Sequence, residues 1–137
     1  MATAWRELAP AVETRIEGQL TGLTPPPVYR SMAPINADLP YIIISPVIQV
    51  EEQVFDDDAE TTEVDFDIAI YSSKTTANAD TIHLGYVDEV INAVRRWTPT
   101  MTNWNSSPIR SDDQTPMQIL EDSIQTVCSF TVVMERK

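Results

Sequence analysis

Apolar residues recur every three or four positions in two stretches of the chain, and each stretch predicts an amphipathic helix. The first helix is expected over residues 3–23, with Gly22 as its stop signal. Pro10 lies inside this stretch and either opens the helix near its first turn or kinks a longer one. The second helix is expected over 77–97 and ends at Thr98–Pro99. The two apolar stripes are Trp5, Leu8, Val12, Ile16 and Leu20, and Ile82, Tyr86, Val90, Val94 and Trp97.

Other stretches alternate between apolar and polar residues, which is typical of strands with one buried face. The clearest is Glu63–Ser72, and Ser123–Met134 alternates in the same way. Tyr41–Val50 is rich in β-branched residues, and Pro46 indicates an edge position or a bend there. Shorter strands are expected at Val28–Ser31 and Ile109–Ser111.

These elements together predict a single α+β domain over residues 1–137. Its sheet is expected to be mainly antiparallel, with four to five strands, and both helices are expected to pack on one face. The length of 137 residues and the hydrophobic content of 42% are sufficient for one core.

The charge of the chain is strongly negative and unevenly distributed. The formal net charge is −12, and nine acidic residues but no basic residue lie between Glu51 and Asp67. Phosphate contacts need clustered Lys and Arg, so this charge argues against binding of nucleic acid through a basic face and against anionic membranes. The longest apolar run, Tyr41–Ile44, is too short to span a bilayer. The acidic loop before the clearest strand carries Glu51, Glu52, Asp56, Asp57, Asp58 and Glu60.

Candidate catalytic and metal-binding groups are few. The single histidine, His83, has Val87 where a second metal ligand would stand, so a structural side chain, solvated or half-buried, is expected. The single cysteine, Cys128, lies on the apolar face of a strand and is expected to act as a small hydrophobe. Asp56-Asp57-Asp58 lacks the alternating ligands and the glycine of a calcium loop, which favours a solvated turn. Three glycines form no phosphate-binding motif, so the sequence predicts no catalytic residue, no cofactor and no metal site.

The segment 98–117 is expected to be irregular, and it carries large side chains of the kinds that are enriched in protein interfaces. Two interpretations stay open: the segment contacts a partner protein, or it folds back onto its own core. The residues concerned are Met101, Trp104, Ile109 and Met117.

The order of elements and several short stretches resemble the tail terminator, or tail completion, proteins of long-tailed bacteriophages and phage-like particles. The resemblance covers nearly the whole chain in order, and the Leu-Pro-Tyr-Ile-Ile-Ile stretch carries most of it. The matching stretches are Trp5–Leu20, Val28-Tyr29, Leu39-Pro40-Tyr41-Ile42-Ile43-Ile44, Ile70-Tyr71-Ser72, Val87–Trp97 and Ile124–Met134.

This resemblance implies a structural protein of the virion, without catalytic residues. Such subunits close into a ring, expected here to be a hexamer, that caps the tail tube and ends its polymerisation. The implied partners are further copies of the chain, the tail tube protein and the head-closure or connector protein. The implied location is the tail or neck of the virion, which is assembled in the cytoplasm of the host bacterium.

Genomic DNA passes through such a ring without specific binding, and a negative lumen repels its phosphates. Part of the acid between Glu51 and Asp67 is therefore expected to face the lumen or the tube. Three other interpretations remain. The chain could be another neck component, such as a head-closure or tube-associated protein. It could be a small regulatory or ligand-binding module, or, remotely, an enzyme that uses Asp112 and Asp113.

Overall fold

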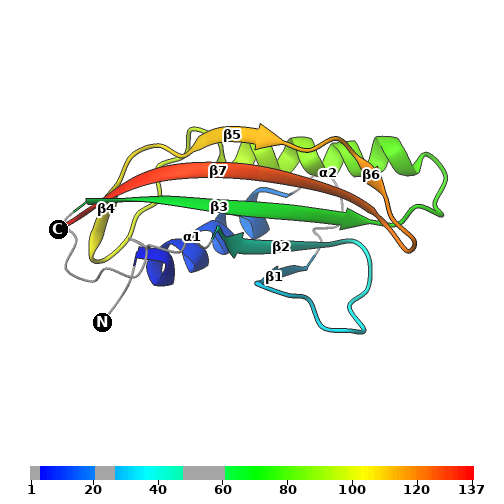
Figure 1. Ribbon diagram of the computed structural model, residues 1–137, viewed down its shortest axis with the longest axis horizontal. Coiled ribbons are helices and arrows are strands. Elements are labelled where there is room, and N and C mark those ends of the chain that lie inside the picture. Colours follow the sequence, from blue (N-terminus) through cyan, green and yellow to red (C-terminus); the bar gives the residue numbers. More distant parts are fainter. Residues whose placement is uncertain (1–3, 21–26, 48–60) are drawn as a thin grey trace.

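The computed structural model describes residues 4–20, 27–47 and 61–137, which form two helices and seven strands (Figure 1). The fold is therefore α+β, as the sequence predicts. In chain order the elements are α1 (Ala4–Gln19), β1 (Val28–Arg30), β2 (Tyr41–Pro46), β3 (Thr61–Ser72), α2 (Ala79–Val94), β4 (Trp104–Ser106), β5 (Arg110–Gln114), β6 (Gln118–Ile119) and β7 (Ile124–Arg136).

The sheet is built around the long antiparallel pair of β3 and β7, which match along their whole lengths (Figure 1). On the outer side of β3 lies β2, which is antiparallel to it, and then β1. On the other side of β7, the short strands β4, β5 and β6 follow one another along the same edge.

The predicted sheet is wrong in two respects: it has seven strands rather than four to five, and it is mixed and curled rather than mainly antiparallel. It is mixed because β1 runs parallel to β2, as the connection between them returns the chain to the end from which β1 starts. The strand number is higher because the chain between α2 and β7 meets β7 in three short pieces. Pro108 and Pro116 separate these pieces, since proline cannot donate a backbone hydrogen bond to a strand ladder.

The core lies between the sheet and the two helices. The even-numbered residues of β3 are buried, and their partners on β7 are buried with them. Phe66 and Phe130 illustrate this register, because they are opposite each other and their rings stack at 5.5 Å. Burial of each such side chain contributes roughly 1.5–3 kcal/mol.

The first helix, α1, is shorter than predicted, and the described part of it begins at Ala4 and ends at Gln19. Pro10 lies inside it, beyond the first turn, so the alternative that Pro10 opens the helix is wrong. Its buried residues are Ala4, Leu8, Ala9, Val12 and Ile16, which include most of the predicted stripe.

The second helix, α2, ends at Val94, three residues before the predicted end. Arg96 adopts a left-handed conformation with φ of 68°, which stops the helix. Its N–H then donates to the carbonyl of Ile109 at 2.8 Å, and the N–H of Ile109 donates to the carbonyl of Trp97 at 2.9 Å. These two hydrogen bonds tie the segment that follows α2 to the chain just before β5.

Both helices pack on one face of the sheet, as predicted. The first helix contacts β1, β2 and β3, the second contacts β3 and β7, and the helices contact each other. In the described part of the chain no helix covers the opposite face, so alternate side chains of every long strand project from it. The acidic and aromatic side chains described below project from this uncovered face.

Candidate functional site

The uncovered face of the sheet carries two different surfaces at its two ends. Residues at odd positions of β3 and β7 project from it, because strand side chains alternate between faces. Towards the start of β3 the side chains are acidic, and towards its end they are aromatic. We call the first surface the acidic patch; it consists of Glu63, Asp65, Asp67, Asp112 and Asp113.

Hydrogen bonds from β7 hold the carboxylates of the acidic patch. Ser129 Oγ donates to Asp67 Oδ1 at 2.7 Å, across the β3–β7 pair. Thr131 Oγ lies within hydrogen-bonding reach of both Asp65 and Asp112, although its single hydrogen serves one of them at a time. Asp65, Asp67 and Asp112 are therefore held by hydrogen bonds, and these contacts link β3 and β5 to β7.

The charge of the acidic patch is only partly compensated. Arg110 Nε donates to Asp112 Oδ1 at 2.9 Å, and both side chains are substantially exposed. Hydrogen bonds from Thr131 and Arg110 hold the pKa of Asp112 below its ordinary value. The hydrogen bond to Asp112, with the nearby charges of Glu63 and Asp65, raises the pKa of Arg110. The acidic patch thus sets five carboxyl side chains beside the single guanidinium of Arg110.

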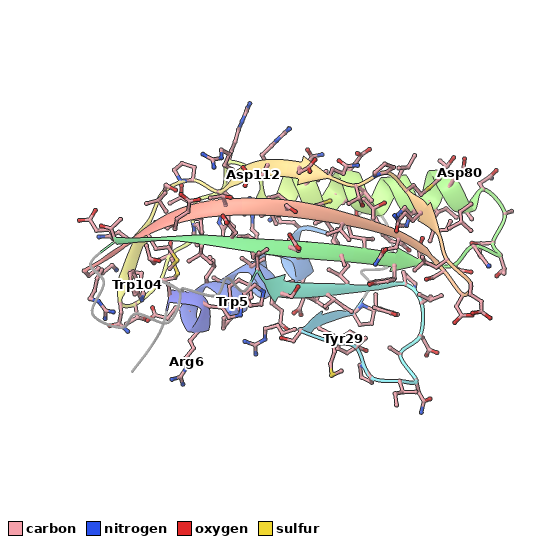
Figure 2. All side chains as sticks on the ribbon, in the orientation of Figure 1. Trp5, Arg6, Tyr29, Asp80, Trp104 and Asp112 are labelled. Atoms are coloured by element: carbon pink, nitrogen blue, oxygen red, sulfur yellow. The ribbon has the colours of Figure 1, made fainter. Side chains whose placement is uncertain are left out.

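Three tyrosines from adjacent strands form the second surface, which we call the tyrosine cluster: Tyr29, Tyr41 and Tyr71. The rings of Tyr29 and Tyr41 meet edge to face at 6.2 Å, and those of Tyr41 and Tyr71 stack at 4.9 Å. Gln125 Nε2 donates to the hydroxyl of Tyr71 at 2.7 Å. Burial, then the proximity of Tyr71 and Asp122, raises the pKa of Tyr41. Figure 2 shows Tyr29 on the edge strand of the sheet.

A hollow of about 350 Å³ lies beside the tyrosine cluster. Tyr41 and Tyr71 line it together with the apolar side chains of Ile35 and Leu120, both of which are exposed to solvent. Such a combination of aromatic rings and exposed aliphatic groups is typical of a contact surface for another molecule.

The sequence did not single out the tyrosine cluster as a site, although its members lie within stretches that carry the resemblance. The sequence does show part of the pattern that marks these three tyrosines. Each tyrosine lies on a strand at a position that faces away from the core, where small polar residues are usual. Their meeting depends on the register of β1, β2 and β3, which periodicity does not reveal.

The predicted acidic loop lies outside the described residues, so the structure does not place Glu51, Glu52, Asp56, Asp57, Asp58 and Glu60. The acid that continues from this loop into β3, at Glu63, Asp65 and Asp67, does project from the uncovered face.

For the segment 98–117, the structure favours packing on the chain's own core over an exposed interface. Met101, Trp104 and Ile109 are buried, and Met117 is half-buried. Trp104 is only 2% exposed, and the guanidinium of Arg136 lies over its ring, 4.6 Å from the centroid. Strands β4 and β5 hold this segment against β7, so it is less irregular than predicted.

His83 is completely buried, rather than solvated or half-buried as predicted, and its role here is structural. Its Nδ1 is 2.7 Å from Ser72 Oγ, and its Nε2 is 2.8 Å from Thr126 Oγ. Burial lowers the pKa of His83, so the ring is neutral and one nitrogen donates while the other accepts. The histidine thus joins α2 to β3 and β7. Although a Ser–His pair can act in catalysis, this one is enclosed by the core, where a substrate cannot reach it.

Cys128 is also buried, and burial followed by the charge of Asp67 raises the pKa of its thiol to about 11. A protonated thiol of this kind packs as a small hydrophobe. Among the residues that the structure describes, no three side chains of the metal-binding kinds come together. In the same ranges, neither helix has the length and apolar character that crossing a bilayer requires.

The sequence of the chain matches no known protein family, and it matches no curated protein. Its fold is nonetheless shared. One solved structure, whose name states no function, is 11% identical, covers 93% of this chain and 93% of its own, and superposes with a TM-score of 0.62. At that identity the likeness concerns the fold alone. This chain is therefore similar to known proteins in its arrangement of two helices on a curled, mixed sheet, and its function has to be argued from its own surfaces.

Proposed function

We propose that the chain is a ring-forming structural subunit that caps the tail tube of a long-tailed bacteriophage and joins the tail to the head-side connector. The observation that carries this proposal is the acidic patch on the uncovered sheet face. Hydrogen bonds from Ser129 and Thr131 fix its carboxylates at the surface, whereas acidic side chains that serve solubility alone need no such fixing.

A channel for DNA needs a wall that repels phosphate, and the acidic patch has the right sign for it. In the proposed ring, the uncovered face is turned towards the lumen, with Asp65 and Asp67 on the wall. The helices then lie away from the DNA and face neighbouring subunits. The resemblance to tail terminator proteins supports the same assignment. The stretches that carry it lie in both helices and include parts of β1, β2, β3 and β7, the strands that shape this face.

The experiment is to mix the purified chain with polymerising tail tube protein encoded by the same genome. We expect tubes to stop growing and their length distribution, measured by electron microscopy, to shorten as the chain concentration rises. A variant with Asp65→Asn and Asp67→Asn is expected to cap tubes as well as the wild type, since these groups face the DNA. Tubes of unchanged length and unchanged end structure would refute the proposal.

A second candidate function, a small binding module, is favoured by the hollow beside Tyr41 and Tyr71. A head-closure or tube-associated protein is the remaining alternative within the virion. A binding module would not affect tubes at all. A head-closure protein would bind the capped tail or the connector, but it would not stop the growth of free tubes.

A further inference from the structure

The hollow beside the tyrosine cluster lies where two segments distant in sequence meet at one end of the sheet. One wall comes from the connection between β1 and β2, which supplies Ile35, Ala37 and Leu39, and another comes from the hairpin between β6 and β7. Figure 1 shows this connection and this hairpin at the same end of the sheet. The volume of about 350 Å³ is near the lower limit of ligand pockets, which is about 300 Å³, so the hollow has room for about one large side chain.

The aromatic rings that line the hollow are held in place by their neighbours. The ring of Tyr41 stacks on that of Tyr71 at 4.9 Å and meets the ring of Tyr29 edge to face. The side-chain amide of Gln125 donates to the hydroxyl of Tyr71. Because the rings are already ordered, a group that packs against them costs little side-chain entropy in this chain. The π face of a tyrosine attracts cations, and in proteins the cation is most often the guanidinium of arginine.

The hairpin between β6 and β7 places two carboxylates on the rim of the hollow. Glu121 and Asp122 form its tip, and the N–H of Leu120 donates to the carbonyl of Ser123 at 2.7 Å to close the turn. Both acidic side chains are exposed, and within the described ranges neither takes part in an ion pair. Burial raises the pKa of Tyr41, and the charge of Asp122 adds to this effect, so the field of that carboxylate reaches the ring.

The described residues that line the hollow include no basic side chain. Lys74 stands beside the hairpin, where its Nζ donates to the carbonyl of Leu120 at 2.9 Å, but it does not line the hollow. The hollow therefore combines aromatic faces with negative charge that the chain itself leaves without a paired cation.

Exposed apolar side chains gather in the two segments that form the walls. Among the large hydrophobic side chains that are exposed in the described ranges, most belong to the β1–β2 connection or to the β6 hairpin: Met32, Ile35, Ile119 and Leu120. Such a concentration of apolar surface around a hollow is typical of a contact surface for another protein.

We propose that the hollow is a docking site for an arginine side chain of a different protein, whose apolar neighbours pack on Ile35 and Leu120. The guanidinium lies against the tyrosine rings and pairs with the carboxylates of Glu121 and Asp122. Arginine suits this site better than lysine, because its planar, weakly hydrated head stacks on aromatic rings and binds carboxylates through two parallel hydrogen bonds. A second copy of the chain is the poorer occupant at this acidic end, since it brings a net charge of −12.

The inference goes beyond the proposed function and does not depend on it. A tube cap, another neck protein and a binding module could each dock a partner at this end of the sheet. The experiments below contain no tubes, so their failure and a failure to cap tubes are separate results.

The first experiment titrates the isotope-labelled chain with the capped peptide acetyl-Leu-Arg-Leu-amide and follows the amide signals by NMR. The reporters are the backbone amides of Leu120 and Ser123 and the side-chain amide of Gln125. We expect saturable shifts with a Kd of roughly 1 mM or tighter, and at least about threefold weaker binding of the same peptide with citrulline, which has the shape of arginine without its charge. Equal binding of the citrulline peptide, or no saturation up to roughly 10 mM peptide, would overturn the inference.

Two pairs of substitutions separate the site from the general charge of the chain. Glu121→Gln with Asp122→Asn removes two charges from the rim, whereas Glu17→Gln with Asp88→Asn removes two exposed charges from the helices. The rim pair is expected to weaken binding of the arginine peptide at least about threefold, and the helix pair is expected to leave it unchanged. Equal weakening by the two pairs would mean attraction to the net charge alone, which contradicts a site at the hollow.

A matched pair at Tyr41 tests the aromatic face. Tyr41→Phe keeps the ring and Tyr41→Leu removes it, and the side chain is only half-buried on the uncovered face, so both variants are expected to fold. We expect Tyr41→Phe to bind the arginine peptide like the wild type and Tyr41→Leu to bind it at least about threefold more weakly. Equal binding by these two variants would show that the ring takes no part. Thermal melts check the folding of every variant.

Sedimentation velocity of the chain without peptide shows whether a second copy is the occupant. We expect the same sedimentation coefficient for the wild type and for the variant with Glu121→Gln and Asp122→Asn. Self-association that this variant abolishes would assign the arginine to a second copy of the chain, and so overturn the assignment to a different protein.

Discussion

Replacement of His83 by leucine tests whether this side chain is a structural link in the core. Leucine has a similar size but leaves the hydroxyls of Ser72 and Thr126 without the partners that lie at 2.7 and 2.8 Å. Both hydroxyls are buried, and each unsatisfied buried group costs about 1–3 kcal/mol. We therefore expect the free energy of unfolding to fall by about 2–6 kcal/mol, a large share of a typical total of about 5–15 kcal/mol.

The same variant has a distinct dependence on pH. Burial lowers the pKa of His83 in the folded chain below the ordinary 6.5, so the unfolded chain takes up a proton at a higher pH than the folded chain does. The contribution of His83 is complete above pH 6.5 and declines as the pH falls towards the folded pKa. In that window the wild type loses up to about 1.4 kcal/mol per pH unit through this group, and His83→Leu does not.

The assay is urea unfolding followed by circular dichroism at several pH values between 5.5 and 7.5. Carboxylates titrate in both proteins, so the difference between wild type and His83→Leu isolates the histidine. Ser72→Ala serves as a control, since it removes one partner and keeps the titrating ring. The reasoning is refuted if His83→Leu is as stable as the wild type at pH 7.5, or if both proteins lose stability equally towards pH 5.5.

Two further predictions concern the core. Trp104→Ala is expected to lower the free energy of unfolding of the isolated chain by about 3–5 kcal/mol, because the ring is 2% exposed. Denaturant melts of the monomer check this, and an unchanged midpoint would mean that Trp104 matters only in assembly. Cys128 is expected to react with a thiol reagent at neutral pH only when the chain unfolds, because its pKa is about 11 and it is buried. Rapid labelling of the native chain would contradict this placement.

Much of the fold could be predicted from local patterns. The alternation in β3 and β7 identified both strands and the faces that they bury, and the apolar stripes identified both helices. The end of α2 was missed because the left-handed turn at Arg96 depends on a hydrogen bond to Ile109, a residue that is distant in sequence. The sequence predicts strand β1 at Val28–Ser31, but not its parallel pairing with β2. It does not predict the short strands β4 and β6, since pairing with distant partners defines them.

The candidate site could be predicted from the sequence less completely than the fold could. Acid concentrated near Asp65 and Asp67 was visible, but its extension to Asp112 and Asp113 requires the pairing of β5 with β7. From the sequence alone, Asp112 and Asp113 are only remote catalytic candidates, whereas the structure places them in the acidic patch. The large side chains of the segment 98–117 were equally compatible with a core and with an interface. Residue type alone does not distinguish these, because both environments favour Trp, Met and Ile.

The most direct test of the proposed function is a cryo-electron microscopy reconstruction of the tail tube end after the chain has been added. We predict a closed ring of chains at the end of the tube, with the uncovered sheet face and its Asp65 and Asp67 turned towards the lumen. Tube ends without added density would contradict the capping function. A ring with the acidic patch on its outer rim would contradict the account of how the chain conducts DNA.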